Sequence, residues 1–199
     1  AAPELKPMVS RAAQLCKADL VSQVVYEFTN LQGIMGRHYA AAAGEHPDVA
    51  QAIEEHYRPT YSGGPLPQNK VGALLAIADK LDTICGCFSV GLAPTGASDP
   101  YALRRQSIGI VQIMLAQQFT FSLRAAIDIS LKHFTPGNAN ETAEAVYGFI
   151  QQRIAHILAE EGFAKDIVAA VVSVSVDHIP NVWQRVAALQ ALKGAPDFE

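Results

Sequence analysis

One histidine and two aspartates are the residues whose types and spacing could support chemistry in this chain. Asp79 and Asp82 are three residues apart, so a helix would make them neighbours on its surface. His56 lies in an earlier stretch with helical spacing, and imidazole and carboxylate groups both bind divalent metals. If the two helices pack together, these residues could form part of a metal site.

All-helical phosphohydrolases of the HD class use a site of this kind, and the helix order expected here resembles theirs. Those enzymes also need a His-Asp doublet, but Lys17 and Asp19 stand where the doublet would be sought. A lysine there would compete with a metal for the carboxylates. We therefore expect a degenerate polar cluster whose members satisfy one another and hold no metal. It consists of Lys17, Asp19, His56, Asp79 and Asp82.

Other common catalytic motifs are missing from the sequence. There is no Gly-x-x-x-x-Gly-Lys-Ser/Thr loop, no Gly-x-Gly-x-x-Gly and no Gly-x-Ser-x-Gly turn. The cysteines Cys16, Cys85 and Cys87 lack the spacing of a zinc site, and we expect them to be reduced thiols in a core. No catalytic residue is therefore predicted.

Basic residues are the second group with a possible function. Arg104 and Arg105 stand near an expected helix start, and arginine suits contact with phosphate. Arg37, Arg58 and Lys17 are further candidates. The net charge of −4 argues against a strongly basic surface, so ion pairs with nearby acids such as Asp99, Glu54 and Glu55 are the alternative.

Apolar residues at helical spacing indicate the elements that would position these groups. The pattern predicts an all-α fold of about eight helices, and no alternating β pattern is present. The predicted helices cover residues 11–31, 47–58, 70–88, 100–116, 122–133 and 140–161, with two more around 167–176 and from 180 onward. In the helix predicted over residues 70–88, Asp82 falls on the apolar stripe, which is an unusual position for a carboxylate.

We expect one compact arrangement, with a helical core over residues 1–135 and C-terminal helices over 136–199 packed on it. Only 17% of the residues are charged, which suggests surface buried against something else. The chain begins with Ala and not Met, so we expect a fragment of a longer protein. No apolar run has the length of a membrane span and no signal peptide is visible, so a cytoplasmic location is expected.

Six short motifs, in this order and spacing, resemble the β subunits of bacterial glycyl-tRNA synthetases. They are Lys-Ala-Asp-Leu (17–20), Glu-Phe-Thr-Asn-Leu-Gln-Gly-Ile-Met-Gly (27–36), Glu-Glu-His-Tyr (54–57), Ala-Asp-Lys-Leu-Asp-Thr (78–83), Pro-Thr-Gly (94–96) and Asp-Pro-Tyr-Ala-Leu-Arg-Arg (99–105). The resemblance is dense over residues 11–109 and looser over 110–176. Each motif alone is weak, but six in order are specific.

The resemblance implies an internal HD-like helical domain of the β subunit of an α2β2 ligase, which joins glycine to tRNA-Gly with ATP. In that family the α subunit activates glycine and the β subunit supplies tRNA recognition. The implied partners are the α subunit, the remaining β-subunit domains, among them an anticodon-binding region, and tRNA-Gly. No cofactor is expected in this part, since ATP is used by the whole enzyme. A metal-dependent phosphohydrolase and a purely structural interaction module are the alternatives.

Overall fold

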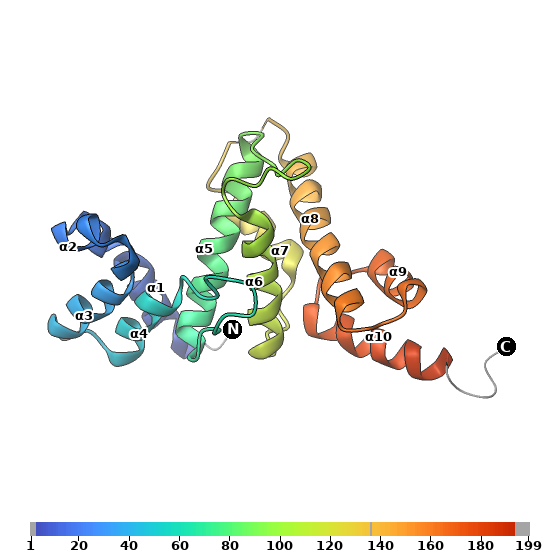
Figure 1. The fold of residues 1–199 in the computed structure, drawn as a ribbon, viewed down its shortest axis with the longest axis horizontal. Helices are drawn as coiled ribbons and strands as arrows, with labels where there is room; N and C mark the ends of the chain where they lie inside the picture. Colours follow the sequence, from blue (N-terminus) through green and yellow to red (C-terminus); the bar gives the residue numbers. More distant parts are fainter. Residues whose placement is uncertain (1–2, 136, 194–199) are drawn as a thin grey trace. The chain divides into compact units, whose positions relative to one another are not determined.

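The computed structural model describes residues 3–135 and 137–193, and in these ranges the chain is helical with no β-strand (Figure 1). Ten α-helices and three short 3₁₀ helices are present there, so the all-α class is confirmed. The α-helices are α1 (Lys6–Leu15), α2 (Gln23–Glu27), α3 (Ile34–Ala42), α4 (Pro47–Glu55), α5 (Lys70–Ser89), α6 (Leu103–Ala116), α7 (Leu123–Leu131), α8 (Ala139–Glu160), α9 (Lys165–Val174) and α10 (Ile179–Lys193). None of these helices combines the length and the apolar character that crossing a bilayer requires.

Two compact units divide the chain, Ala1–Lys80 and Leu81–Glu199. The division falls within α5, which runs unbroken from Lys70 to Ser89. The joint that the sequence suggested between residues 135 and 136 involves Pro136, which lies outside the described residues, and it stays a prediction.

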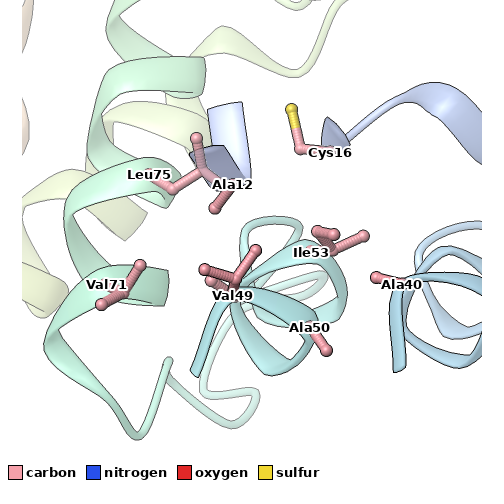
Figure 2. Close-up of a cluster of buried hydrophobic side chains, with 9 residues drawn as sticks. Ala12, Cys16, Ala40, Val49, Ala50, Ile53, Val71 and Leu75 are labelled. Atoms are coloured by element: carbon pink, nitrogen blue, oxygen red, sulfur yellow. The ribbon is translucent and has the colours of Figure 1, made fainter. Parts of the chain in front are cut away.

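The core of the first unit is built around α4. Val49 and Ile53 of this helix are buried, and they lie between Ala40 of α3 and Val71 and Leu75 of α5 (Figure 2). The helix begins as the sequence predicts, with Pro47 in the first turn, and the ring Nδ1 of His46 accepts a hydrogen bond from the Asp48 backbone N–H. This packing fixes the C-terminal end of α4, where His56 lies.

The helix predicted over residues 11–31 is wrong, because the chain breaks there into α1, a 3₁₀ turn at Ala18–Val21, α2 and a second 3₁₀ turn at Thr29–Leu31. Its apolar spacing misled us: Val25 is buried, but Val21 is 92% exposed and Phe28 60% exposed. Helix α3 was not predicted at all. Both differences have one cause, the burial of Asp19, which is described below.

The second unit contains the C-terminal part of α5 and helices α6 to α10. Helices α6 and α7 both pack against α8, and α9 and α10 pack together. The predicted apolar face of α6 is confirmed, and that of α8 is confirmed except at Ile157, which is half-buried. The buried residues on these faces are Leu103, Ser107, Ile110, Val111 and Met114, and Val146, Ile150, Ile154 and Leu158.

Two helix starts in this unit differ from the prediction. Helix α6 begins at Leu103 and not at Pro100, although Asp99 still caps it by accepting from the N–H groups of Leu103 and Arg104 at 2.8 and 3.0 Å. Helix α8 is capped by Asn138 instead of Asn140. In both cases the capping residue type was recognised, but the position of the first helical turn was not.

Candidate functional site

Asp19 is one of the five residues of the predicted polar cluster, and it lies in the first unit. It is buried, and its Oδ2 accepts hydrogen bonds from the backbone N–H groups of Gly33 and Gly36 at 2.7 and 3.1 Å. Those N–H groups belong to the first turn of α3, where no intrahelical acceptor exists. Asp19 therefore serves as a cap from a distant part of the chain, and it pulls the backbone around residues 16–22 out of a continuous helix.

The two glycines of the Leu-Gln-Gly-Ile-Met-Gly motif permit this contact. Gly33 has φ of +79°, a conformation that L side chains rarely adopt. At Gly36 a Cβ atom would lie 2.7 Å from Cγ2 of Ile53 and 3.1 Å from Cγ of Asp19. The motif thus encodes a close approach of α3 to Asp19 and α4.

Lys17 and Asp79 form an ion pair, with 2.5 Å between Nζ and Oδ1. Burial would lower the pKa of Lys17, but the hydrogen bond and the charge of Asp79 outweigh this effect and raise the pKa above its ordinary value. The lysine therefore stays charged and occupies the carboxylate. A contact between Lys17 and a carboxylate is what the sequence indicated; its effect on metal binding stays a prediction.

His56 is buried at the C-terminal end of α4. Its Nδ1 lies 2.7 Å from the carbonyl oxygen of Ile53, so Nδ1 carries the proton and donates it to that oxygen. Burial lowers the pKa of His56, although the charge of Asp79 opposes this, and the ring is held neutral. Its Nε2 is buried and has no hydrogen-bond partner in residues 3–135 and 137–193.

Lys80 is a member of the cluster that the sequence analysis missed. The residue is buried, and its Nζ donates to the backbone carbonyl of His56 at 3.0 Å. Burial lowers the pKa of Lys80 to about 8, while Asp79 acts in the opposite direction. Its spacing was a usable signal, because Lys80 falls four residues from both Ala76 and Ile84 on the buried stripe of α5.

Asp82 does not belong to the cluster. It is exposed, so its predicted place on the apolar stripe of α5 is wrong, and Leu81 and Lys80 take the buried positions instead. Among the described residues there is no group of three His, Cys, Asp or Glu side chains that could hold a metal ion. Lys17 pairs with Asp79, and Oδ2 of Asp19 accepts from two amides, whereas Oδ1 of Asp19 has no hydrogen-bond partner among the described residues.

Arg37 and Arg58 meet at one acid in the first unit. Glu54 accepts from Arg37 at 2.8 Å and from Arg58 at 2.7 Å, and Arg58 also reaches Glu55 at 3.1 Å. Glu55 is buried and accepts further hydrogen bonds from the backbone N–H groups of Gln68 and Asn69 at 2.9 and 3.4 Å. Glu55 therefore holds residues 68 and 69, which follow α4, and Arg58 supplies its charged partner.

Arg104 and Arg105 lie in the first turn of α6, in the second unit. Arg104 donates to the carbonyl oxygen of Gly96 at 2.8 Å, and Arg105 is exposed. Neither has a carboxylate partner in the part of the chain that the structure describes. The expected alternative, an ion pair with Asp99, does not form, and both oxygens of Asp99 accept backbone N–H groups of α6.

Comparison with known proteins shows which family the chain is similar to. The sequence profile of the family described as "Glycyl-tRNA synthetase beta subunit" matches residues 2–173. The chain is 54% identical over 98% of its length to the glycine–tRNA ligase β subunit of Desulforapulum autotrophicum and 50% identical over its whole length to that of Desulfatibacillum aliphaticivorans. A third β subunit, from Geotalea uraniireducens, is 48% identical over 99% of the chain. The chain spans about 30% of the length of these curated relatives.

Proposed function

Because the chain belongs to the family of glycyl-tRNA synthetase β subunits, we propose that it works as a helical part of an α2β2 glycine–tRNA ligase. The complete ligase would join glycine to tRNA-Gly with ATP, and this part would contribute to tRNA recognition and to domain assembly. The partners are the α subunit, the remaining β-subunit domains and tRNA-Gly, in the cytoplasm. The observation that carries the proposal is 54% identity over 98% of the chain to a protein named as that subunit.

The polar cluster supports a structural role and not a catalytic one. Lys17 and Asp79 neutralise each other, Asp19 caps α3 and Lys80 holds the carbonyl of His56. An HD-type phosphohydrolase needs carboxylates and imidazoles that are free to bind a metal. The cluster has none in that arrangement among the described residues, so we do not retain the hydrolase as a candidate.

The basic residues divide into two groups, according to whether contact with RNA would break an ion pair. Lys17, Arg37 and Arg58 each have a carboxylate partner, and contact with a phosphate would require these ion pairs to break. Arg104 and Arg105 have no carboxylate partner among residues 3–135 and 137–193, so contact with a phosphate would break no ion pair with a described residue. All five stay candidates for contact with tRNA, and the absence of a competing acid favours Arg104 and Arg105.

A chimeric β subunit tests the proposed function. The matching segment of the Desulforapulum autotrophicum β subunit is replaced by residues 2–193 of this chain, and the product is combined with the α subunit of that organism. We expect glycylation of tRNA-Gly with a kcat within tenfold of the parent enzyme. A chimera that assembles with the α subunit but neither binds nor glycylates tRNA-Gly would contradict the proposal.

A purely structural interaction module is the second candidate, and one observation favours it. Large apolar side chains are exposed together on residues 20–39, including Val21 at 92%, Tyr26 at 79% and Phe28 at 60%. In the complete ligase we expect the longer β polypeptide to cover this surface. In the chimera, V21D with F28D should then reduce subunit assembly while the tRNA affinity of the assembled fraction stays unchanged.

A further inference from the structure

Tyr101 is an exposed aromatic residue in the loop that joins α5 to α6 (Figure 1). It precedes Arg104 by three residues, and it is 48% exposed. Its carbonyl oxygen accepts a 3.0 Å hydrogen bond from Nε2 of Gln106, which belongs to the first turn of α6. Because Arg104 and Arg105 lie in that same turn, Tyr101 is beside the two arginines in space as well as in sequence.

The backbone around Tyr101 is fixed by hydrogen bonds. The N–H group of Ala102 donates to the carbonyl oxygen of Asp99 at 3.0 Å, and the Asp99 carboxylate accepts from the N–H groups of Leu103 and Arg104. Ala102 has φ of +53°, in the left-handed region that residues with a Cβ atom seldom occupy. The aromatic side chain therefore extends from a turn that is already ordered, which lowers the conformational entropy lost when a ligand binds to it.

The two arginines beside Tyr101 supply positive charge in two forms. Arg104 donates to the carbonyl oxygen of Gly96 at 2.8 Å and is thereby attached to the same loop, whereas Arg105 is exposed. Neither forms an ion pair within residues 3–135 and 137–193. An exposed aromatic ring next to arginines without acid partners is the combination with which proteins bind single-stranded nucleic acid, because the ring takes a base and the arginine takes a phosphate.

This combination fits an unpaired nucleotide better than a base-paired one. In an RNA duplex the faces of the bases are stacked on one another, so a protein reaches mainly phosphates, 2′-hydroxyl groups and base edges. An unpaired base can present its face to an aromatic side chain while its phosphates stay accessible to arginine. An exposed tyrosine at this position would gain little from a duplex.

We propose that Tyr101 stacks on an unpaired base of tRNA-Gly and that Arg105 contacts a phosphate next to that base. The inference rests on the proposed function and deepens it, because it names the kind of nucleotide that this part of the β subunit holds. In the sequence analysis Tyr101 was only one letter of a family motif, and no role was assigned to it.

Titration of tRNA-Gly at several salt concentrations, with the chimeric ligase, tests the stacking contact. We expect Y101A to weaken tRNA binding about tenfold and to leave the slope of log K against log salt unchanged, because stacking releases no counterions. Y101F keeps the ring and should bind within about twofold of the parent. Y61A is the matched control, since Tyr61 is 59% exposed and follows Arg58, which is paired with Glu54 and Glu55. It should change neither quantity.

Two further measurements separate the base from the phosphate. R105Q should lower the salt slope by about one, in contrast to Y101A. A photoreactive benzophenone side chain at position 101 should cross-link to an unpaired nucleotide of tRNA-Gly. A cross-link confined to base-paired nucleotides would overturn the stacking contact.

Thermal unfolding of each variant separates loss of binding from loss of folding. If Y101A folds normally and binds tRNA as Y61A does, the stacking contact is refuted while the proposed function stands. A lowered salt slope in Y101A would also refute it, because the tyrosine would then act through the arginines. Loss of α-subunit assembly in Y101A with unchanged tRNA affinity would refute it in favour of a protein contact. If the unmodified chimera binds no tRNA at all, the proposed function fails first.

Discussion

The ammonium group of Lys80 donates a 3.0 Å hydrogen bond to the backbone carbonyl of His56, and both residues are buried. His56 is the C-cap of α4, where the last carbonyl groups have no intrahelical donor. A cation at this end of a helix also interacts favourably with its dipole. Lys80 therefore joins α5 to the end of α4 and is neither a surface residue nor part of a metal site.

The low pKa of Lys80 makes the stability of the first unit depend on pH. In the fold the pKa is about 8, whereas an unfolded lysine titrates near 10.4. Between these values the unfolded chain binds more protons, so the free energy of unfolding should rise with pH. The rise is up to about 3 kcal/mol in total and should be absent in K80M. Urea unfolding at pH 7.5 and pH 9.5 measures it.

The control for this prediction is K70M, which removes an exposed lysine from the start of the same helix. Buried thiols act in the opposite direction, since burial raises the pKa of Cys85 to about 11, but they contribute equally to all three proteins. The quantity compared is therefore the change in the free energy of unfolding between the two pH values, in K80M against the unmodified protein and K70M. If K80M and K70M show the same pH dependence, Lys80 is not the group responsible.

Replacement of glycine by alanine should have opposite effects on stability at Gly36 and at Gly148. At Gly36 an added Cβ would meet Ile53 at 2.7 Å, so G36A should destabilise the protein by about 1–3 kcal/mol. At Gly148, inside α8, a Cβ would meet nothing within 4 Å, and G148A should stabilise it by up to about 1 kcal/mol through helix propensity. Denaturant unfolding of the two variants compares them directly. Equal effects would show that α3 does not approach Asp19 as closely as described.

Asp19 should be essential for the start of α3. D19A leaves the buried N–H groups of Gly33 and Gly36 without an acceptor and should cost about 2–4 kcal/mol. D19N keeps one acceptor oxygen and should cost less. Hydrogen exchange of the α3 amides reports the local effect, and faster exchange confined to other helices would argue against the capping role.

The sequence was sufficient for the helices that have their own caps and a single apolar face. The start of α4 at Pro47 and both ends of α5, 70–89 against the predicted 70–88, were located to within one residue, because Pro47 marks the first and a long apolar stripe defines α5. The end of α4 was not, since the helix ends at Glu55 and the predicted end was residue 58. The prediction for residues 11–31 was wrong because the buried Asp19 binds amides 14 and 17 residues away. A tertiary contact of this kind overrides local spacing and cannot be read from periodicity.

The sequence indicated the kinds of groups in the candidate site, but not all of the residues that form it. Lys17 was expected to compete with a metal for the carboxylates; the structure shows its ion pair with Asp79, and the competition itself stays a prediction. Asp82 was included and Lys80 omitted because the apolar stripe was drawn through position 82. Positions 80 and 82 are about 200° apart around the helix axis, so they lie on nearly opposite faces, and it is Lys80 that is buried. The ion pairs of Arg37 and Arg58 depended on where α4 ends, which the sequence indicated only to within a few residues.

Substitutions of Arg37 and Arg58 should affect mainly stability, whereas substitutions of Arg104 and Arg105 should affect mainly RNA binding. R58Q leaves the buried Glu55 without its charged partner and should destabilise the protein by about 2–4 kcal/mol, whereas R37Q, at a more exposed pair, should cost less than about 1 kcal/mol. R104Q with R105Q breaks no ion pair with a described residue and should change the free energy of unfolding by less than about 1 kcal/mol. In the chimeric ligase the same double variant should weaken tRNA-Gly binding and lower its salt dependence, because two uncompensated charges are lost. A double variant that binds tRNA as tightly as the parent, with an unchanged salt slope, would show that the N-terminal turn of α6 does not contact RNA.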